Sequence, residues 1–254
     1  MKTIVCLKAV PKAIANLQIA DAGDRIDCQS NQMFLNESDE YALEAALAIK
    51  MLLGGEVIAV TLGKLPAQRA LQTGLAKGVD RAVRVDDQIR NAEATSAALA
   101  AAIKKIGYDL ILTGVESSDS LGGEVGIRIA AKLKIPCAYA VVGVEPEDGL
   151  GKLKVTKEIG GGMKQVLEMS LPSLLCIQQG ILPLSFVPLK NMLQAQTRPI
   201  ERISPDTLDI PKQPGKLRVI QVGRPVETHR ATMIDGEPAE LAHKLYDIIR
   251  SFSQ

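Results

Sequence analysis

The sequence is poor in aromatic residues and has no excess of charge of either sign. It contains three Phe, four Tyr and no Trp, and its 30 Lys and Arg balance 29 Asp and Glu. Proteins that bind single-stranded nucleic acid need aromatic surfaces on which bases stack, and duplex-binding domains normally carry a basic excess. These two absences exclude nucleic acid from the partners that we expect.

Cysteine and histidine are also scarce, and they are scattered along the chain: Cys6, Cys28, Cys137, Cys176, His229 and His243. No two cysteines form a C-x-x-C pair. A structural zinc site needs closely spaced Cys and His ligands, and a disulfide framework belongs to oxidising compartments. The sequence therefore predicts no metal site, no disulfide framework and a reducing compartment, the cytoplasm.

Long apolar runs are missing as well. None approaches the roughly 20 residues that a membrane-spanning helix needs, and the chain enters a strand-like run without a signal-peptide pattern. We therefore expect no membrane span. The hydrophobic fraction is still 46%, and Ala, Val, Leu and Ile must supply it because aromatic residues are few. This composition is typical of a layered α/β protein.

Short apolar runs alternate with helix-period segments in the first half of the chain. We expect strands at residues 4–10, 57–62, 81–85 and 110–113. We expect helices at residues 38–53, from Pro66 to Gly78, at 91–106 and at about 122–133. This rhythm predicts a parallel sheet, whose ligands lie outside the carboxyl ends of the strands. The rule points to the loops after Val10, Leu62, Val85 and Thr113.

The second half of the chain has a different pattern. Residues 152–158 alternate in polarity and 163–169 return across three glycines, which predicts a hairpin. A short strand is expected at residues 174–177, and a long proline-rich excursion, of the kind that often carries contacts, at 180–215. We expect a terminal strand at residues 217–222 and a final helix at 238–251.

The segment from Asp109 to Gly126 is the most informative for chemistry. A strand ends at Thr113, a polar loop follows, and two glycines open a helix. Free N–H groups at a helix start carry partial positive charge, and glycine lets a phosphate approach the backbone. A capped crossover, with Asp119 or Ser120 as the cap, explains the local pattern equally well. Neither G-x-G-x-x-G nor a P-loop motif is present.

A second polar segment precedes the first helix, at residues 36–47. Asn36 or Ser38 is expected to cap this helix, and capping is favoured over ligand binding when the motif is taken alone.

Four stretches resemble, in order, those of the β subunit of electron transfer flavoproteins: residues 4–10, 36–47, 114–126 and 188–201. Residues 74–80 match a further alanine- and glycine-containing motif of that family. Each motif is weak alone, but their shared order and spacing extend the resemblance over nearly the whole chain.

The resemblance implies a doubly wound, mainly parallel α/β sheet, similar to adenine nucleotide α-hydrolases, with an added β-hairpin and a C-terminal arm that embraces a partner. Residues 1–180 would form the nucleotide-binding α/β domain with its hairpin. Residues 181–254 would form the docking loop and the arm, and residues 234–245 resemble the tail helix that embraces the α subunit.

In this family the α subunit carries the redox-active FAD, and the β subunit usually holds AMP as a structural ligand. Electron-bifurcating members hold a second FAD at the same place. The resemblance assigns that place here to Cys6, Asn36, Glu37, Ser38, Asp39, Leu62, Gly114, Asp119, Gly122, Gly123, Glu124 and Val125. Helix-start amides would hold the phosphate, Asp39 and the backbone would hold the adenine edge, and Asp119 would organise the loop.

The chain also departs from the family pattern. Leu121 stands where the family usually has a second aspartate, Glu37 replaces a proline, and Ala13 lies where several members have an aromatic residue. Glu124 replaces a glutamine at the phosphate-facing turn. Two unit charges about 4 Å apart cost roughly 4 kcal/mol at an effective dielectric near 20. Either the Glu124 carboxylate faces solvent, or the phosphate site is weakened.

The function implied by the resemblance is that of an electron carrier subunit without independent catalysis. Electrons would enter the α-bound FAD from a flavin dehydrogenase and leave toward a quinone reductase or another acceptor. No nucleophile–base pair is visible in the sequence, which agrees. Leu189 and Met192 match the loop that docks partner dehydrogenases through an exposed leucine. The alternative is that both pack on the α subunit or on their own domain.

Two other functions remain open. Residues 94–100 resemble a segment of bifurcating members, in which a second FAD in this chain would oxidise NADH. The chain could also be a stand-alone adenine-nucleotide sensor with a similar fold.

Overall fold

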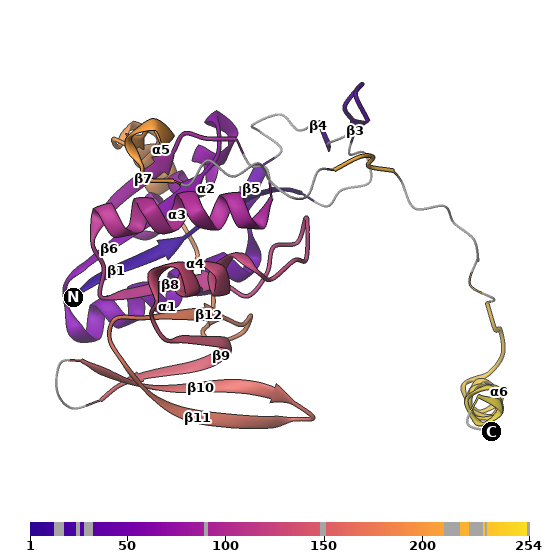
Figure 1. Ribbon diagram of the computed structural model, residues 1–254. Helices are drawn as coiled ribbons and strands as arrows, with labels where there is room; N and C mark the ends of the chain where they lie inside the picture. Colours follow the sequence, from indigo (N-terminus) through magenta and orange to yellow (C-terminus); the bar gives the residue numbers. More distant parts are fainter. Residues whose placement is uncertain are drawn as a thin grey trace. The chain divides into compact units, whose positions relative to one another are not determined.

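The computed structural model describes residues 1–12, 18–23, 26–27, 33–88, 91–147, 151–210, 219–223, 231 and 233–252 (Figure 1). The chain divides into two compact units, Met1–Gln221 and Val222–Gln254. The first unit contains a large sheet and the helices that flank it. The predicted division at residue 180 separates a nucleotide-binding domain from a docking segment, and it stays a prediction.

The sheet has nine strands in the order β11-β10-β9-β12-β8-β1-β6-β7-β13. Their bounds are Lys2–Cys6 (β1), Glu56–Leu62 (β6), Arg81–Val85 (β7), Leu110–Gly114 (β8), Cys137–Pro146 (β9), Lys152–Gly160 (β10), Met163–Ser170 (β11), Ser173–Ile177 (β12) and Glu201–Ile203 (β13). All neighbours from β9 to β13 pair in parallel, whereas β10 pairs antiparallel with β9 and β11. The predicted α/β fold with a mainly parallel sheet is confirmed.

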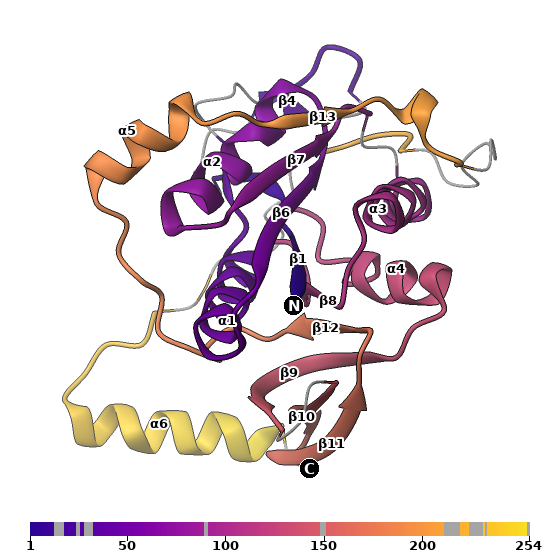
Figure 2. The same ribbon diagram turned by 90° about the vertical axis from the view of Figure 1, so that its left-hand side faces the viewer.

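Helices cover both faces of the sheet. α1 (Glu37–Leu53) and α2 (Gln68–Lys77, preceded by η2, Leu65–Ala67) lie on one face, and α3 (Ala92–Ile106) and α4 (Val125–Leu133) on the other (Figure 2). Successive side chains of β1 enter opposite cores, since Val5 belongs to one buried cluster and Ile4 and Cys6 to the other. A strand buried on both faces must be apolar throughout, which explains the continuous apolar runs.

The predicted helices are confirmed, except that the one expected from residue 122 begins three residues later. The Asn91 side chain accepts the Ala94 N–H at 2.8 Å and so caps α3. Gly78 ends α2 with φ at 116°. Gly123 has φ at 59°, in the left-handed region. The helical path therefore cannot extend through it, and α4 starts at Val125.

Several sequence predictions need correction. The single strand expected at residues 4–10 is two elements, because β1 ends at Cys6 and β2 (Ala9–Pro11) pairs antiparallel with β5 (Met33–Leu35) outside the main sheet. β9 was not expected. The excursion after residue 180 contains α5 (Leu189–Thr197), β13 and η3 (Pro205–Thr207).

The terminal strand expected at residues 217–222 is wrong for residues 219–222, which form no strand, and residues 217–218 lie outside the described part of the chain. Two short strands, β3 (Gln18–Ile19) and β4 (Ile26–Asp27), pair with each other.

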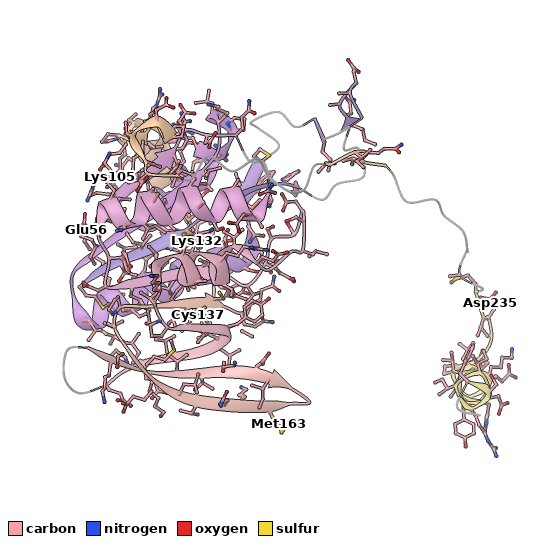
Figure 3. All side chains as sticks on the ribbon, in the orientation of Figure 1. Glu56, Lys105, Lys132, Cys137, Met163 and Asp235 are labelled. Carbon is pink, nitrogen blue, oxygen red and sulfur yellow. The ribbon has the colours of Figure 1, made fainter. Side chains whose placement is uncertain are left out.

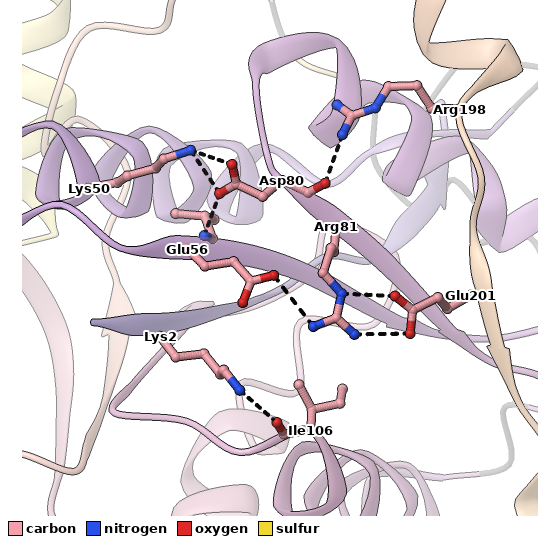
Figure 4. A network of polar contacts seen from close by, with 9 residues as sticks. Lys2, Lys50, Glu56, Asp80, Arg81, Ile106, Arg198 and Glu201 are labelled. Atoms are coloured by element: carbon pink, nitrogen blue, oxygen red, sulfur yellow. Dashed lines mark hydrogen bonds and ion pairs between the residues drawn. The ribbon is translucent and has the colours of Figure 1, made fainter.

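A polar network fastens the segment around β13 to the rest of the sheet (Figure 4). The Arg81 guanidinium donates to both carboxylate oxygens of Glu201 at 2.9 and 3.0 Å. Arg198 donates to the carbonyl oxygens of Val79 at 3.0 Å and Asp80 at 2.7 Å. These contacts place α5 and β13 although their local sequence has few regular signals.

The second unit contains α6 (Pro238–Ser251), in agreement with the predicted final helix. No helix in the described residues is long and apolar enough to cross a membrane.

Candidate functional site

A cavity of about 410 Å³ opens at the carboxyl ends of β1, β6 and β8. Nine of the predicted site residues line it: Cys6, Asp39, Leu62, Gly114, Asp119, Gly122, Gly123, Glu124 and Val125. These residues come from four separate parts of the chain. The expected position of a ligand in a doubly wound sheet therefore coincides with a real cavity.

The other three predicted site residues do not line the cavity. Asn36 is buried behind it, where its side-chain amide donates to the Glu116 carbonyl oxygen at 2.8 Å and its side-chain oxygen accepts the Ser118 N–H at 3.1 Å. Asn36 therefore braces the loop after β8 and makes no side-chain cap to α1. Ser38 is buried and Glu37 is exposed.

Asp39 joins two strand ends. Its carboxylate accepts the Lys8 N–H at 2.7 Å on one oxygen and the Gly114 N–H at 3.0 Å on the other. A Cβ on Gly114 would lie 2.5 Å from a carboxylate oxygen of Asp39, so only glycine permits this close approach. The start of α1 is thus held between β1 and β8, and this arrangement gives the cavity its floor.

Burial raises the pKa of Asp39 to about 7, although the two backbone N–H groups act in the opposite direction. Between pH 4 and pH 7 the folded protein therefore holds a proton that the unfolded chain has released. The contribution of this group to stability falls as pH rises through that window and is level above it. We expect Asp39→Asn to flatten the pH dependence of the free energy of unfolding by up to about 4 kcal/mol between pH 4 and 7.

Denaturant unfolding at several pH values measures this effect. Asp119→Asn is the matched control, because the contact with Lys8 lowers the pKa of Asp119 in spite of its partial burial. The stability that Asp119 contributes is lost only as pH falls below about 4. Parallel stability profiles for wild type and Asp39→Asn would show that Asp39 does not titrate in this range.

Five consecutive residues that line the cavity, Gly122 to Gly126, provide a row of unpaired backbone amides. Within the described part of the chain, none of the five N–H groups from Gly122 to Gly126 donates to a backbone or side-chain acceptor. The first N–H groups of a helix have no partner inside it, and the left-handed turn at Gly123 extends the row backward from α4. Free amides at a helix start are typical of anion-binding sites, because each carries a partial positive charge.

Glu124, whose carboxylate charge would repel a phosphate, is paired with a cation in the structure. Its carboxylate accepts hydrogen bonds from Arg128, one turn along α4, at 2.6 and 2.7 Å. Arg128 also pairs with Glu93 at 2.8 Å, and Glu93 pairs with Lys132 at 2.6 Å. The four charges sum to zero. Glu124 is therefore neutralised along the outer face of α4, and its repulsion of an anion at the amide row is weakened.

Lys8 is a cavity residue that the sequence analysis missed. Its ammonium group donates to Asp119 at 2.6 Å and to the Ser117 hydroxyl at 3.0 Å. Lys8 therefore brings a cation to the cavity wall, where the sequence analysis had expected only Asp119 to organise the loop. Lys8 follows the last residue of β1 by two positions, in the kind of loop that carries ligands at the carboxyl end of a strand. This place was hidden because the strand was expected to continue to Val10.

The cavity also reaches the beginning of α3. Asn91, Ala92, Thr95 and Leu99 line it, and all four belong to the segment that follows β7. The available space therefore extends beyond the amide row toward a second helix start.

Comparison with known proteins agrees with this geometry. The model of the electron transfer flavoprotein domain matches residues 25–208. The electron transfer flavoprotein subunit beta of Methylophilus methylotrophus is 34% identical over 99% of this chain and 99% of its own. The chain belongs to the electron transfer flavoprotein β subunit family.

Other members of the family are similar over somewhat less of their length. The electron transfer flavoprotein subunit beta of Bacillus subtilis is 30% identical and covers 89% of this chain and 90% of its own. The caffeyl-CoA reductase-Etf complex subunit CarD of Acetobacterium woodii is 34% identical and covers 79% of this chain and 77% of its own.

The two residues matched to the family's docking loop differ in their surroundings. Leu189 is the first residue of α5 and 74% of its side chain is exposed. Met192 is partly buried and packs against the core next to α2. Leu193, one turn after Leu189, is also exposed and was not predicted. Exposure at Leu189 suits a contact with another protein, whereas Met192 fastens α5 to its own unit.

Proposed function

We propose that this chain is the β subunit of an electron transfer flavoprotein heterodimer and has no catalytic reaction of its own. Electrons from a flavin dehydrogenase would pass through the FAD carried by the α subunit to a quinone reductase or another acceptor. Family membership over the full length of the chain supports this role. We place it in the cytoplasm, because its few and scattered cysteines are typical of proteins in a reducing compartment.

We propose AMP as the ligand of the cavity, and the unpaired amide row from Gly122 to Gly126 carries this assignment. A phosphate there would accept several charge-assisted hydrogen bonds and lie near the Lys8 ammonium group. The volume of about 410 Å³ is near the lower end of the range for small-molecule sites, roughly 300–1,000 Å³. This favours a mononucleotide.

The remaining cavity residues fit an adenine ring. Leu62 and Val125 supply apolar wall, and the Asp39 carboxylate keeps lone pairs that its two backbone donors leave free. An exocyclic amine could donate to one of them. In this arrangement the nucleotide would join the ends of β6 and β8 and stabilise the folded chain by mass action.

A second candidate is an electron-bifurcating role with a second FAD in this chain that oxidises NADH. The observation that favours it is the extension of the cavity to Thr95 and Leu99 on α3, within the segment that resembles bifurcating members. A larger dinucleotide would use that extension, whereas AMP would leave it to solvent.

Co-expression with an α-like chain tests the role as a heterodimer subunit. We expect a 1:1 complex that carries flavin and is reduced by a flavin dehydrogenase. A stable monomer that does not associate with the α-like chain but binds adenine nucleotide would support the sensor function and contradict the heterodimer.

Leu189→Ala tests docking. Because the side chain is exposed, its loss should leave the melting temperature and nucleotide content unchanged. We expect kcat/KM for electron transfer from the partner dehydrogenase to fall roughly 10-fold, as expected for a buried interface leucine worth at least 1.4 kcal/mol. Met51→Ala is the control, since Met51 is also an exposed apolar residue but lies at the end of α1. Unchanged electron transfer would remove Leu189 from the docking surface.

A further inference from the structure

Two cysteines lie side by side at the junction between the parallel sheet and the hairpin. Cys137, which is labelled in Figure 3, is the first residue of β9. Cys176 lies on the neighbouring strand β12. Cys137 pairs in register with Leu174, two residues before Cys176. Side chains two residues apart on a strand point to the same face, so both thiols lie on the side of the sheet that α4 covers.

The local backbone departs from regular pairing at this point. Ala138 pairs with Leu175 and Val141 with Ile177, so that two residues of β9 lie opposite Cys176 alone. Ala140, one of the two, has φ at 56°. This bulge bends β9 beside Cys176.

The two thiols have contrasting surroundings. Cys137 is exposed, whereas only 1% of Cys176 is exposed. A hydrogen bond with Cys176 lowers the pKa of Cys137, burial acts in the opposite direction, and the charge of Lys157 lowers the pKa further. The same hydrogen bond, together with burial, raises the pKa of Cys176. An accessible thiol next to a cation is the reactive kind, and a buried neighbour can act as the resolving thiol.

The position of the Cys176 sulfur is fixed by its neighbours. A Cβ on Gly126 would lie 2.7 Å from this sulfur and 2.5 Å from the Thr113 hydroxyl, so the first turn of α4 rests on both groups. Within the described residues the buried Thr113 hydroxyl oxygen has no hydrogen-bond partner. It is available to support charge on the Cys176 sulfur.

We propose that Cys137 and Cys176 are a redox pair, which forms a reversible disulfide between β9 and β12 when the protein meets a hydroperoxide. The Cys137 thiolate attacks one peroxide oxygen, the O–O bond breaks, and a sulfenic acid forms with release of hydroxide. The Cys176 thiol then attacks this sulfur. The S–S bond forms, and the sulfenic oxygen leaves with the thiol proton as water. With hydrogen peroxide, two thiols lose two electrons and one peroxide becomes two waters.

Peptide mapping of the full-length chain, purified with its α subunit, tests the pair. The protein is treated with a small excess of hydrogen peroxide, its remaining thiols are alkylated, and the peptides are analysed by mass spectrometry. We expect a peptide pair linking Cys137 to Cys176, which dithiothreitol separates. We also expect Cys137 to be modified at least about 10-fold faster than Cys6, whose pKa burial raises to about 12.

Two variants make the outcome specific. In Cys176→Ser the sulfenic acid at Cys137 should persist long enough to be trapped by dimedone. In Cys28→Ser the link between Cys137 and Cys176 should form as in wild type. Oxidation of Cys137 to sulfinic acid without a link, or a link from Cys137 to Cys28 or to a second copy, would overturn the proposal. The wild-type map decides by itself if a variant fails to fold.

Discussion

Gly122→Val is expected to empty the nucleotide cavity, with affinity for AMP falling roughly 100-fold or more. A Cβ at Gly122 would meet no protein atom within 4 Å, yet the residue lines the cavity. The new side chain would therefore add bulk at the lining of the cavity, next to the amide row, without disturbing the fold. Loss of two charge-assisted hydrogen bonds, each worth about 1.5–3 kcal/mol, accounts for this factor. Calorimetric titration with AMP measures it.

Two further glycine variants separate binding from folding. Gly223→Val is the matched control, because its Cβ would also meet nothing within 4 Å and it does not line the cavity. It should bind AMP normally. Gly123→Val should lose both AMP and stability, since φ there is 59° and the Cβ would lie 2.9 Å from the Tyr139 hydroxyl. Full AMP content in Gly122→Val would show that the phosphate lies elsewhere.

The second large effect is expected on α6. Leu241, Leu245, Ile248 and Phe252 follow one another at helical spacing and form an apolar stripe. None of the α6 residues is buried. If the arm embraces the α subunit, the double change of Leu245 and Ile248 to Asp should weaken the heterodimer on the order of 100-fold or more. The double change removes two side chains that the α subunit would bury, worth about 1.5–3 kcal/mol each. It also places charges in an apolar interface.

Analytical ultracentrifugation with purified α subunit measures this loss. Changing His243 and Arg250 to Asp is the control, because both residues are exposed polar positions of the same helix. The control changes the charge by −3, against −2 for the test variant, and does so away from the stripe, so the heterodimer should persist. Equal weakening in both double variants would show that charge, and not the apolar stripe, governs the association.

Periodicity in the sequence predicts the central elements well, because the strands buried on both faces must be continuously apolar. β7 and α6 agree with the predicted bounds. α5 and β13 could not be predicted in this way. Their positions depend on contacts of Arg198 and Glu201 with residues more than 100 positions away, and such contacts leave no local pattern.

The candidate site follows the same division. The resemblance brought most of the cavity residues together, and the structure places nine of the twelve around one space. The resemblance did not show that Asn36 turns its side chain to the loop after β8, or that Arg128 pairs with Glu124. The contact of Asn36 depends on which side chains meet after the elements pack, whereas the pair of Glu124 and Arg128 lies within one helix at i,i+4 spacing and could have been read from the sequence. Lys8 was hidden for a smaller reason, a strand end placed four residues too late.

The most direct test of the account is mass spectrometry of the ligands released from the purified complex of this chain with its α subunit. The assignment of FAD to the α subunit and AMP to the amide row predicts one FAD and one AMP per heterodimer. Two FAD and no AMP would assign the cavity to a second flavin and support the bifurcating role. One FAD with no adenine nucleotide beside it would contradict the nucleotide site at Gly122 to Gly126.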